Sequence, residues 1–574
     1  MDKINLTRRG ALVGAAGMGL AVSGCSAPDI EAFNPEEAGV FAFSVASGDP
    51  DQTSLVLWTA VVLPDNVRDY EVTVELAADA SFSNHPRFTA TPMSETWRTA
   101  EVHGRRVAFI KYLVTDLAPG QFYYYRFTYT AGSIGEVSPT GMTRTLPEGH
   151  VEEYTIGVFS CSNFPAGHFN VYGEAARNDT LDLVLHLGDY IYEYAADGYA
   201  TSNSVELNRV SDPVHEILTY EDYVVRHAQY KRDPDLQALH AAAPWILVWD
   251  DHETANDSYA TGAENHNEGE GDWYARRDVA VRAWYDWMPA REPEVLIDRR
   301  GVFEIGDLAT LCMLETRLTA RSEVMDYEDF PIDPNSEMTE ENLAIVDAWK
   351  GDVIGADDRE LMGAQQIADV QAACAASVAA GKPWRILGNQ VIMSRVNFPD
   401  FTTEMPGWLR WIATRDNEFA RRFINSTRFE IPFNLDMWDG FPAERERLFS
   451  ALRAVNADIV TVTGDVHSFW TNDLVDGEGH RMGTEFVTAS VTSPAPFSSF
   501  EAPGVDYGKM MRDANEPVRH CNMTDHGYIR MVLTPTQIDA EYIKVSTILS
   551  RSYEASTESA WRLTPGGGAV ERTA

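Results

Sequence analysis

The sequence predicts an α/β protein with a central sheet, preceded by a small all-β domain. From residue 41 to 148, short segments of alternating apolar and polar residues recur, separated by turn residues. From residue 152 to 550, apolar strand segments alternate with helical segments, which is typical of an α/β arrangement. The chain has 574 residues, of which 44% are hydrophobic, so it is long enough for two or three domains with large cores.

The first predicted domain is an antiparallel β-sandwich of the fibronectin or immunoglobulin type. Its strands are "SLVLWTAVV", "DYEVTVELA", "RRVAFIKYLVTDL" and "QFYYYRFTYTAG", which lie between residues 41 and 148. It contains no group of catalytic residue types, so we expect the chemistry to lie after residue 152. Residues 26–40 are predicted to be a linker, and residues 551–574 a disordered C-terminal tail.

Residues 1–25 have the layout of an export signal. Arg8 and Arg9 precede a Gly/Ala-rich apolar stretch, residues 10–22, which is too short for a stable transmembrane helix. Twin arginines in this position indicate the twin-arginine export machinery. The stretch ends in Val-Ser-Gly-Cys, which resembles a lipobox with Cys25 as the lipidated residue; the alternative is a plain cleaved signal. We therefore expect an exported protein, in the periplasm or at the cell surface, which a lipidated Cys25 would tether to a membrane.

Charge and cysteine spacing exclude two classes of protein. The formal net charge is −41, and such a surface repels phosphate groups, so nucleic acid binding by bulk charge is excluded. The same charge attracts divalent cations. The five cysteines include no CxxC pair, which excludes a zinc knuckle. Cys312 and Cys374 lie in an apolar strand and an Ala-rich helix, so we interpret them as core thiols.

Four apolar strands of the second domain end in residue types that bind metal ions. One such ending is an ordinary turn, but four in one domain are hard to explain by turns alone. Ligands bind at strand ends in open α/β sheets, so these residues are candidates for one site. The four endings contribute Cys161; Asp189 and Tyr192; Asp250, Asp251, His252 and Asn256; and Asp465 and His467.

This set of side chains suits a two-metal centre. A carboxylate must bridge the two ions, and Asp189 is the natural choice. The Cys161 thiolate and the Tyr192 phenolate favour ferric iron, and His467 can complete that pocket. Hard oxygen ligands favour calcium, magnesium or manganese in the second pocket. Its candidate ligands are Asp189, Asp251, Asp465 and Asn256.

The same motifs carry a resemblance to a known family. "GDYIY" is similar to the GDxxY of purple acid phosphatases, "DDHE" stands where the metallophosphoesterase superfamily has Gly-Asn-His-Asp/Glu, and "GDVH" stands where it has Gly-His-x-His. With Ser-Cys, "GNQ" and "MWDGFPAERERL", the chain resembles the alkaline phosphatase D (PhoD-like) family from about residue 40 to 550. The resemblance implies a metallophosphoesterase-type β-sandwich core with flanking helices for residues 152–550.

The resemblance also implies an activity and roles for single residues. It implies a calcium-dependent phosphomonoesterase and phosphodiesterase that holds ferric iron and one or two calcium ions. His252 matches the superfamily histidine that contacts phosphate and protonates the leaving group, with its pKa tuned by Asp250 or Glu253. The implied ligands are Cys161, Asp189, Tyr192 and His467 for iron, and Asp189, Asp465 and Asp251, or alternatively Asn256, for calcium.

Two further residues are candidates for substrate binding, each with a structural alternative. Asn389 ends the strand "WRILGNQ" and either reaches the site or forms a turn. Arg317 in "LETRLTAR" either holds a phosphate oxygen or forms a surface ion pair. Glu315 stands where the resembling family has Asp in this segment, which leaves the role of the segment open.

The sequence thus predicts an exported phosphoesterase that hydrolyses phosphate monoesters, diesters or both with a metal-activated hydroxide. One alternative keeps the site and changes the substrate: a phospholipase D-like phosphodiesterase acting on lipid or wall polymers, which a lipid anchor at Cys25 would favour. The other is a non-enzymatic calcium-binding surface protein. The complete set of metal-ligand types speaks against that second alternative.

Overall fold

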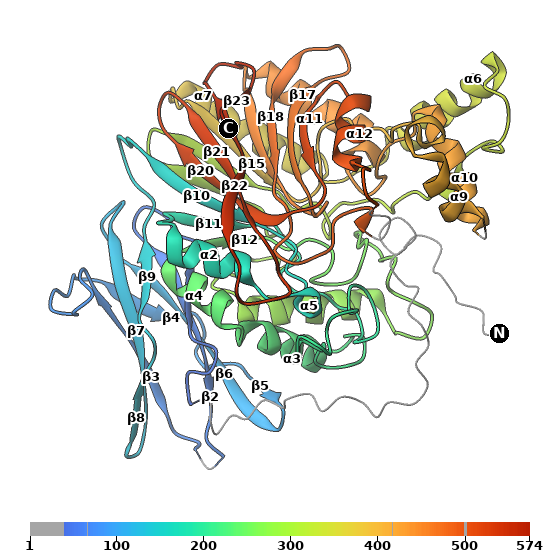
Figure 1. Cartoon of the computed structure of the whole chain (residues 1–574). Coiled ribbons are helices and arrows are strands. Elements are labelled where there is room, and N and C mark those ends of the chain that lie inside the picture. The colour runs from blue at the N-terminus through green and yellow to red at the C-terminus, as the bar shows by residue number, and fades with distance from the viewer. Residues whose placement is uncertain (1–38, 66, 416, 499–501) are drawn as a thin grey trace, which may run out of the picture.

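The computed structural model describes residues 39–574 except residues 66, 416 and 499–501. Two large β-sheets form the body of the molecule, and helices cover their outer faces (Figure 1). The predicted signal with Cys25, and nearly all of the predicted linker, lie outside the described residues. In the part of the chain that the structure describes, no helix is long and apolar enough to cross a membrane.

The first sheet has twelve strands and mixes parallel and antiparallel pairs. Its three central strands β10, β11 and β12 are parallel to one another, and antiparallel strands extend the sheet beyond β10. The strand β5 (Thr99–Val102) pairs with β6 beside the main path. The order is β23 (Glu571–Arg572), β22 (Ala555–Leu563), β21 (Ile538–Val545), β20 (His526–Leu533), β10 (Tyr154–Phe159), β11 (Leu183–His186), β12 (Trp245–Leu247), β1 (Val45–Gly48), β2 (Leu55–Val62), β6 (Arg105–Thr115) and β4 (Thr89–Pro92).

The second sheet has seven strands and packs on the first through a shared apolar core. Leu185 of the first sheet and Leu311 and Val462 of the second are fully buried in that core. Strands buried on both faces read as continuous apolar runs, which is why these segments are recognisable in the sequence. The order is β13 (Gly301–Ile305), β14 (Ala309–Met313), β15 (Trp384–Asn389), β16 (Ile459–Thr463), β18 (Arg481–Val487), β17 (Phe469–Val475) and β19 (Val518–Asn522).

The N-terminal region is all-β, as predicted, and one of its strands pairs with a strand of the second predicted domain. A four-stranded sheet of β3 (Glu71–Ala77), β7 (Phe122–Ala131), β8 (Ile134–Val137) and β9 (Gly141–Arg144) packs on β2 and β6. Strand β1 pairs with β12 through Gly48 and Trp245, so the sandwich shares the twelve-stranded sheet with the rest of the chain. A Cβ on Gly48 would lie 2.3 Å from the Pro289 carbonyl oxygen, so only glycine permits this approach.

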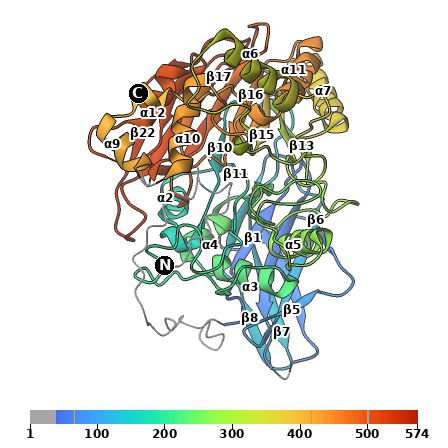
Figure 2. The same cartoon turned by 90° about the vertical axis from the view of Figure 1, so that its right-hand side faces the viewer.

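The helices follow from their sequence signals and cover the two sheets. Helix α3 begins at Tyr220, and its N-cap Thr219 forms a capping box with Asp222. Helices α2 to α5 pack on the first sheet, and α7 and α11 on the second, while α6, α9 and α10 form a lobe at one side (Figures 1 and 2). The bounds are α2 (Asn170–Asn178), α3 (Tyr220–Lys231), α4 (Pro234–Ala242), α5 (Trp273–Trp287), α6 (Glu340–Ala348), α7 (Ala364–Ala379), α8 (Phe401–Glu404), α9 (Gly407–Thr414), α10 (Glu418–Ser426), α11 (Pro442–Ala454) and α12 (Tyr507–Ala514), with the short helices η1 (Phe164–Ala166), η2 (Tyr327–Asp329), η3 (Trp349–Ile354), η4 (Thr427–Phe429) and η5 (Trp438–Gly440).

The disordered tail predicted for residues 551–574 is wrong. Residues 555–563 form β22, which pairs with β21 along its whole length, and Trp561 is buried in the core between the sheets. The sequence signal was weak because the first four residues of "ASTESAWRL" are largely exposed and only the last part supplies apolar side chains. Pairing with a neighbouring strand, rather than local composition, holds this segment in place.

Candidate metal centre

The predicted ligand residues follow strands of both sheets that end at one place. In the first sheet, β10 leads to Cys161, β11 leads to Asp189, and β12 leads to the segment 250–253. In the second sheet, β16 leads to Asp465 and His467. Because the sheets pack face to face, the ends of these strands meet across the core, and the structure brings the side chains together.

The backbone is constrained at four of these residues. Cys161, Asp189, Asp465 and His467 have φ values of 60°, 56°, 61° and 54°, in the left-handed region that non-glycine residues rarely adopt. Such conformations cost about 1–3 kcal/mol each and collect at functional sites. Gly188, with φ of 106°, precedes Asp189; a Cβ there would lie 2.3 Å from the Asp250 nitrogen. The position before Asp189 therefore requires glycine, because a side chain there would clash with the Asp250 backbone.

The first ligand group combines a thiol, a carboxylate and an imidazole. Ligand atoms of Cys161, Asp189 and His467 all lie within 4.8 Å of one another. The Tyr192 hydroxyl donates a 2.8 Å hydrogen bond to Asp189 Oδ2 and lies 3.3 Å from His467 Nε2. All four side chains are buried. The structure thus assembles the four residues for which the sequence predicts an iron site.

The electrostatics of this group fit a bound cation. Burial raises the pKa of the Cys161 thiol and of the Tyr192 phenol well above their usual values, and the charge of Asp189 adds to both effects. Burial lowers the pKa of His467 to about 3. Asp189 Oδ1 is buried and has no hydrogen-bond partner among the described residues. A bound metal ion would give the Asp189 oxygen a partner. Coordination to the ion would also remove the proton of the Cys161 thiol.

Two further ligand groups adjoin the first and share members with it. The second group consists of Asp189, Asp251 and His252. The third consists of Asp250, Asp251 and Asp465. Within each group the ligand atoms lie within 4.8 Å of one another. Asp189 therefore belongs to two adjacent groups, which is the position that a bridging carboxylate requires. The second and third groups are rich in oxygen, as the sequence predicts for a second pocket.

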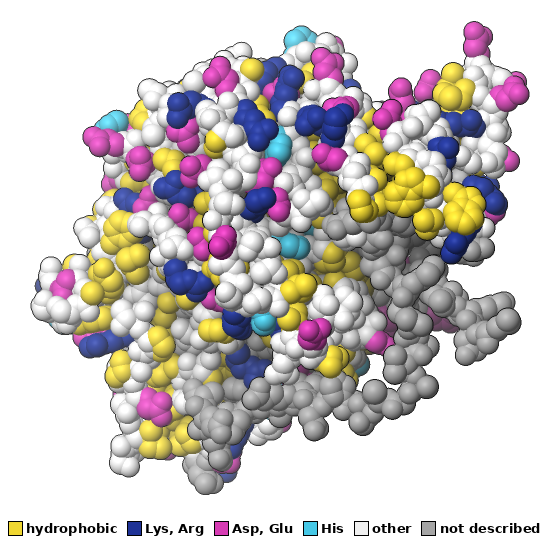
Figure 3. Space-filling model, in the orientation of Figure 1, with side chains coloured by type: hydrophobic (Ala, Val, Ile, Leu, Met, Phe, Trp, Pro, Cys, Tyr) yellow, Lys and Arg dark blue, Asp and Glu magenta, His cyan; other side chains and the backbone are white. Residues whose placement is uncertain are grey.

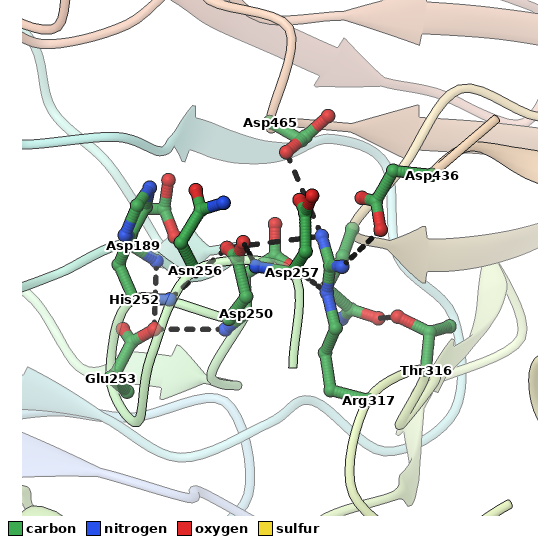
Figure 4. Close-up of polar contacts among 12 residues, drawn as sticks. Asp189, Asp250, His252, Glu253, Asn256, Asp257, Thr316, Arg317, Asp436 and Asp465 are labelled. Atoms are coloured by element: carbon green, nitrogen blue, oxygen red, sulfur yellow. Dashed lines mark hydrogen bonds and ion pairs between the residues drawn. The ribbon is translucent and has the colours of Figure 1, made fainter. Parts of the chain in front are cut away.

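Arg317 lies inside this acidic cluster, so the surface ion pair considered for it is wrong. The side chain is fully buried. It pairs with Asp250 through Nε and lies 2.8 Å from Asp436 Oδ1 through Nη1 (Figure 4). Its Nη2 lies 3.8 Å from Asp251 and 3.7 Å from Asp465, and makes no hydrogen bond among the described residues. This nitrogen can donate to an oxyanion that enters the cluster.

The cluster holds more negative charge than its arginines can balance. Burial raises the pKa of Asp189 and Asp465 well above the usual range, neighbouring aspartates add to the effect, and the pKa of Asp250 rises to about 6. Buried charges are costly unless they are paired or coordinate metals, so the arrangement fits additional cations. The six aspartates are Asp189, Asp250, Asp251, Asp257, Asp436 and Asp465, and the two arginines are Arg317 and Arg321.

His252 has a different partner from those expected. Its Nδ1 lies 2.8 Å from Glu193 Oε2, and the other Glu193 oxygen accepts 2.8 Å hydrogen bonds from the Asn256 backbone and the Asn265 side chain. Although burial opposes protonation, Asp251, Asp189 and Glu193 together raise the pKa of His252 well above its usual value.

Asp250 and Glu253, which the sequence suggests for tuning His252, have other bonded partners in the structure. Asp250 pairs with Arg317, and Glu253 accepts backbone hydrogen bonds from Asp189, Tyr190 and Asp250 at 2.7–3.0 Å. Glu253 therefore shapes the two loops that carry the ligands.

The two asparagines differ in their availability. Asn256 lies beside the cluster in Figure 4, and its amide nitrogen is 3.4 Å from Glu264. Asn389 is buried, donates to Val391 and Thr463, and accepts a 3.2 Å hydrogen bond from Trp438. Because these contacts engage both atoms of its amide, the structure favours the turn role of Asn389 over substrate binding.

Sequence reasoning missed several residues of the site. Glu193 directly follows "GDYIY", and Asp436 directly precedes "MWDGFPAERERL", so proximity to a motif was the only available signal. Tyr199 has no sequence signal; its hydroxyl lies 3.5 Å from His467 Nδ1. Ser493 donates a 2.6 Å hydrogen bond to the Tyr192 hydroxyl from a distant loop.

Two packed sheets whose strand ends present carboxylates, imidazoles and a thiol in adjacent groups form a candidate metal-binding site. Comparison with known proteins agrees. Residues 156–542 match the family model of PhoD-like phosphatases, and residues 26–147 match that of the PhoD-like phosphatase N-terminal domain.

Two individual relatives cover most of the chain. The chain is 31% identical over 522 residues to alkaline phosphatase D of Bacillus subtilis (strain 168), covering 88% of this chain and 77% of that protein. A solved structure of PhoD matches with a TM-score of 0.71 at 27% identity, covering 96% of this chain and 94% of that one. The chain therefore belongs to the PhoD-like phosphatase family and is a hydrolase of phosphoric ester bonds. The predicted family and its α/β fold with an all-β N-terminal region are confirmed.

Proposed function

We propose that this protein is an exported, metal-dependent phosphoesterase that acts on phosphate monoesters, diesters or both. The observation that carries the proposal is the position of Asp189, which belongs to two adjacent ligand groups of different chemistry. We assign ferric iron to Cys161, Asp189, Tyr192 and His467, and one or two calcium ions to the oxygen-rich side formed by Asp189, Asp251, Asp465 and Asn256.

The chemistry of the donors supports this division. A thiolate and a phenolate favour a trivalent, Lewis-acidic metal such as iron. Carboxylate oxygens favour calcium, with magnesium or manganese as alternatives for the same pocket. When bound, the ions would neutralise charge on the phosphoryl oxygens and activate the attacking water.

The protein residues would bind the substrate and move one proton. Arg317 Nη2, which has no hydrogen-bond partner among the described residues, would hold a phosphoryl oxygen. His252 is bonded to Glu193 through Nδ1, so Nε2 is left to donate a proton to the leaving oxygen. The Asp465 side chain keeps 17% exposure while those of Asp250 and Asp251 keep 1% and 4%, so the ester would enter beside Asp465.

The first test combines metal content, visible spectrum and hydrolysis on one purified sample. We expect iron and calcium, a phenolate-to-iron charge-transfer band, and hydrolysis of p-nitrophenyl phosphate or its bis-ester that EGTA abolishes. The variant Tyr192→Phe should lose the band, whereas Tyr199→Phe, which alters a neighbouring phenol, should keep it. A colourless protein that stays inactive with added iron and calcium would overturn the assignment.

The choice between substrates rests on the ratio of the two esters. A preference for the bis-ester, and for phospholipid over p-nitrophenyl phosphate, would support the phospholipase D-like alternative. The family match and the assembly of the ligand residues speak against the non-enzymatic alternative. Export and a membrane tether rest on the sequence of residues 1–25, and loss of acylation in Cys25→Ser would test the tether.

A further inference from the structure

Helix α9 presents an apolar face that no other part of the described chain covers. Trp408, Trp411 and Ile412 are 53%, 60% and 49% exposed, and these two tryptophans are the most exposed of those that the structure describes. Their spacing of three and four residues places them on one side of the helix. Leu409, on the other side of the helix, is buried in the apolar core between the second sheet and the helices that cover it. Large exposed apolar patches mark interaction sites.

The charge around this face is opposite to that of the whole chain. The net charge of the protein is −41, yet residues 407–428 contain five arginines and only two acidic residues. Arg421 and Arg422 are exposed on α10, where Arg421 pairs with Glu418, and the Arg415 guanidinium lies 5.2 Å from the centre of the Trp411 ring. Figure 3 shows the exposed hydrophobic side chains of this lobe with Lys and Arg side chains beside them.

We propose that α9 and α10, together with the adjoining α8, bind the surface of an anionic phospholipid bilayer. Tryptophan is favoured at the level of the lipid headgroups, and exposed apolar residues flanked by arginine are typical of helices that lie in that interface. The arginines would attract anionic headgroups while Trp408, Trp411 and Ile412 insert between them.

A second copy of this chain is a less suitable occupant, because two molecules of charge −41 repel each other. The acidic residues of α6, such as Glu340 and Glu341, constrain the orientation. They must face away from the lipid while α9 faces it. The inference does not depend on the proposed catalytic function, and it places the protein on a membrane even where Cys25 carries no lipid.

The test uses the full chain with Cys25→Ser, so that no acyl group contributes. Hydrogen exchange of residues 407–422 is followed with vesicles of phosphatidylcholine alone and of phosphatidylcholine with phosphatidylglycerol. We expect protection of this segment by the anionic vesicles only, and loss of protection in high salt. Because the readout is local, binding through other parts of the chain does not produce it.

Variants in the same background identify the side chains. Trp408→Ser with Trp411→Ser should abolish the protection, and Arg421→Gln with Arg422→Gln should weaken vesicle binding by up to about thirtyfold. Tyr274→Ser removes an aromatic side chain of 46% exposure on α5 and should change neither. Absent protection, or equal protection by neutral vesicles, would overturn the proposal. So would concentration-dependent dimerisation that the tryptophan variant abolishes, since that result would assign the face to a second copy.

Discussion

Two buried polar clusters lie on either side of Tyr190, and they differ in how their titratable groups are accommodated in the core. On one side, Asp189 belongs to the acidic cluster at the strand ends. On the other, the Tyr190 hydroxyl lies 2.8 Å from His240 Nε2, in a cluster that also contains Lys231. The acidic cluster contains a counter-charge, Arg317, among its aspartates, whereas burial lowers the pKa of the bases in the basic cluster.

The basic cluster contains no acidic partner among the described residues. Lys231 is 1% exposed, and its Nζ lies 3.1 Å from His240 Nε2. Burial alone lowers the pKa of Lys231 well below its usual value. Burial also lowers the pKa of His186, His227 and His240, and Lys231 adds to the effect. The groups therefore pack as neutral side chains. Tyr190 and Lys231 contact His240 Nε2, and the His240 ring stacks on Trp245, whereas His227 has no hydrogen-bond partner among the described residues.

The comparison shows that titratable residues in a buried cluster do not by themselves indicate a site. In the acidic cluster, Asp189 has a carboxylate oxygen without a hydrogen-bond partner among the described residues, Arg317 Nη2 makes no hydrogen bond among them, and four ligand residues have positive φ. Those features cost free energy in the absence of a ligand, so they point to function. The basic cluster also has buried ring nitrogens without a hydrogen-bond partner, on His186, His227 and His240. Among the described residues, however, none of its members has a positive φ and none belongs to a group of ligand atoms.

The largest effect should come from Asp189→Asn, which removes the carboxylate shared by two ligand groups. We expect hydrolysis of p-nitrophenyl phosphate to fall by about a thousandfold or more, with loss of bound metal. Assay of kcat together with elemental analysis checks this. Asp513→Asn, in an exposed ion pair on α12, is the matched control and should leave both unchanged. Full metal content in Asp189→Asn would exclude the bridging role.

Arg317→Met should destabilise the metal-free protein more than any change in the basic cluster. It leaves Asp250, Asp436 and their neighbours without their buried counter-charge, which costs about 3–5 kcal/mol. Calcium should restore part of that loss by supplying positive charge to the same oxygens. Denaturant unfolding with EGTA and with calcium measures both effects. A variant as stable as the wild type in EGTA would contradict the account of the cluster.

Glu193→Gln should slow hydrolysis by about ten- to a hundredfold without removing any proposed metal ligand. The substitution keeps the shape but removes the charge that holds the His252 imidazolium. Proton donation matters most for poor leaving groups, so the loss should be larger for an alkyl phosphate than for p-nitrophenyl phosphate. Comparison of kcat/KM for the two substrates is the measurement. Equal losses would assign Glu193 a purely structural role.

Lys231→Met should have the smallest effect. It removes an unpaired buried amine, so the free energy of unfolding should stay constant or rise by up to about 2 kcal/mol, with activity unchanged. The folded-state pKa lies below the unfolded value of 10.5, so the unfolded wild-type chain binds more protons between the two values. Raising the pH towards 10.5 should therefore stabilise the wild type relative to the variant. Thermal unfolding across this pH range would reveal a constant difference if Lys231 stays charged in the fold.

The sequence by itself determined the class of fold and most of the ligand types. Apolar runs such as those of β11 and β16 are local patterns. The sequence itself places Asp189 and Asp465 just after these runs. Strand ends of neighbouring parallel strands converge, so a list of strand endings already predicts a shared site. The N-terminal strands can also be predicted, because their alternation of apolar and polar residues is a local pattern.

Only the tertiary structure decided which partner each charged group has. Glu193 rather than Asp250 faces His252, Arg317 is enclosed by aspartates, and Lys231 has no acid beside it. Likewise, the pairing of β1 with β12 joins the two predicted domains into one sheet. These are contacts between residues far apart in the sequence. Because pKa values depend on burial and on such neighbours, no local pattern can specify them.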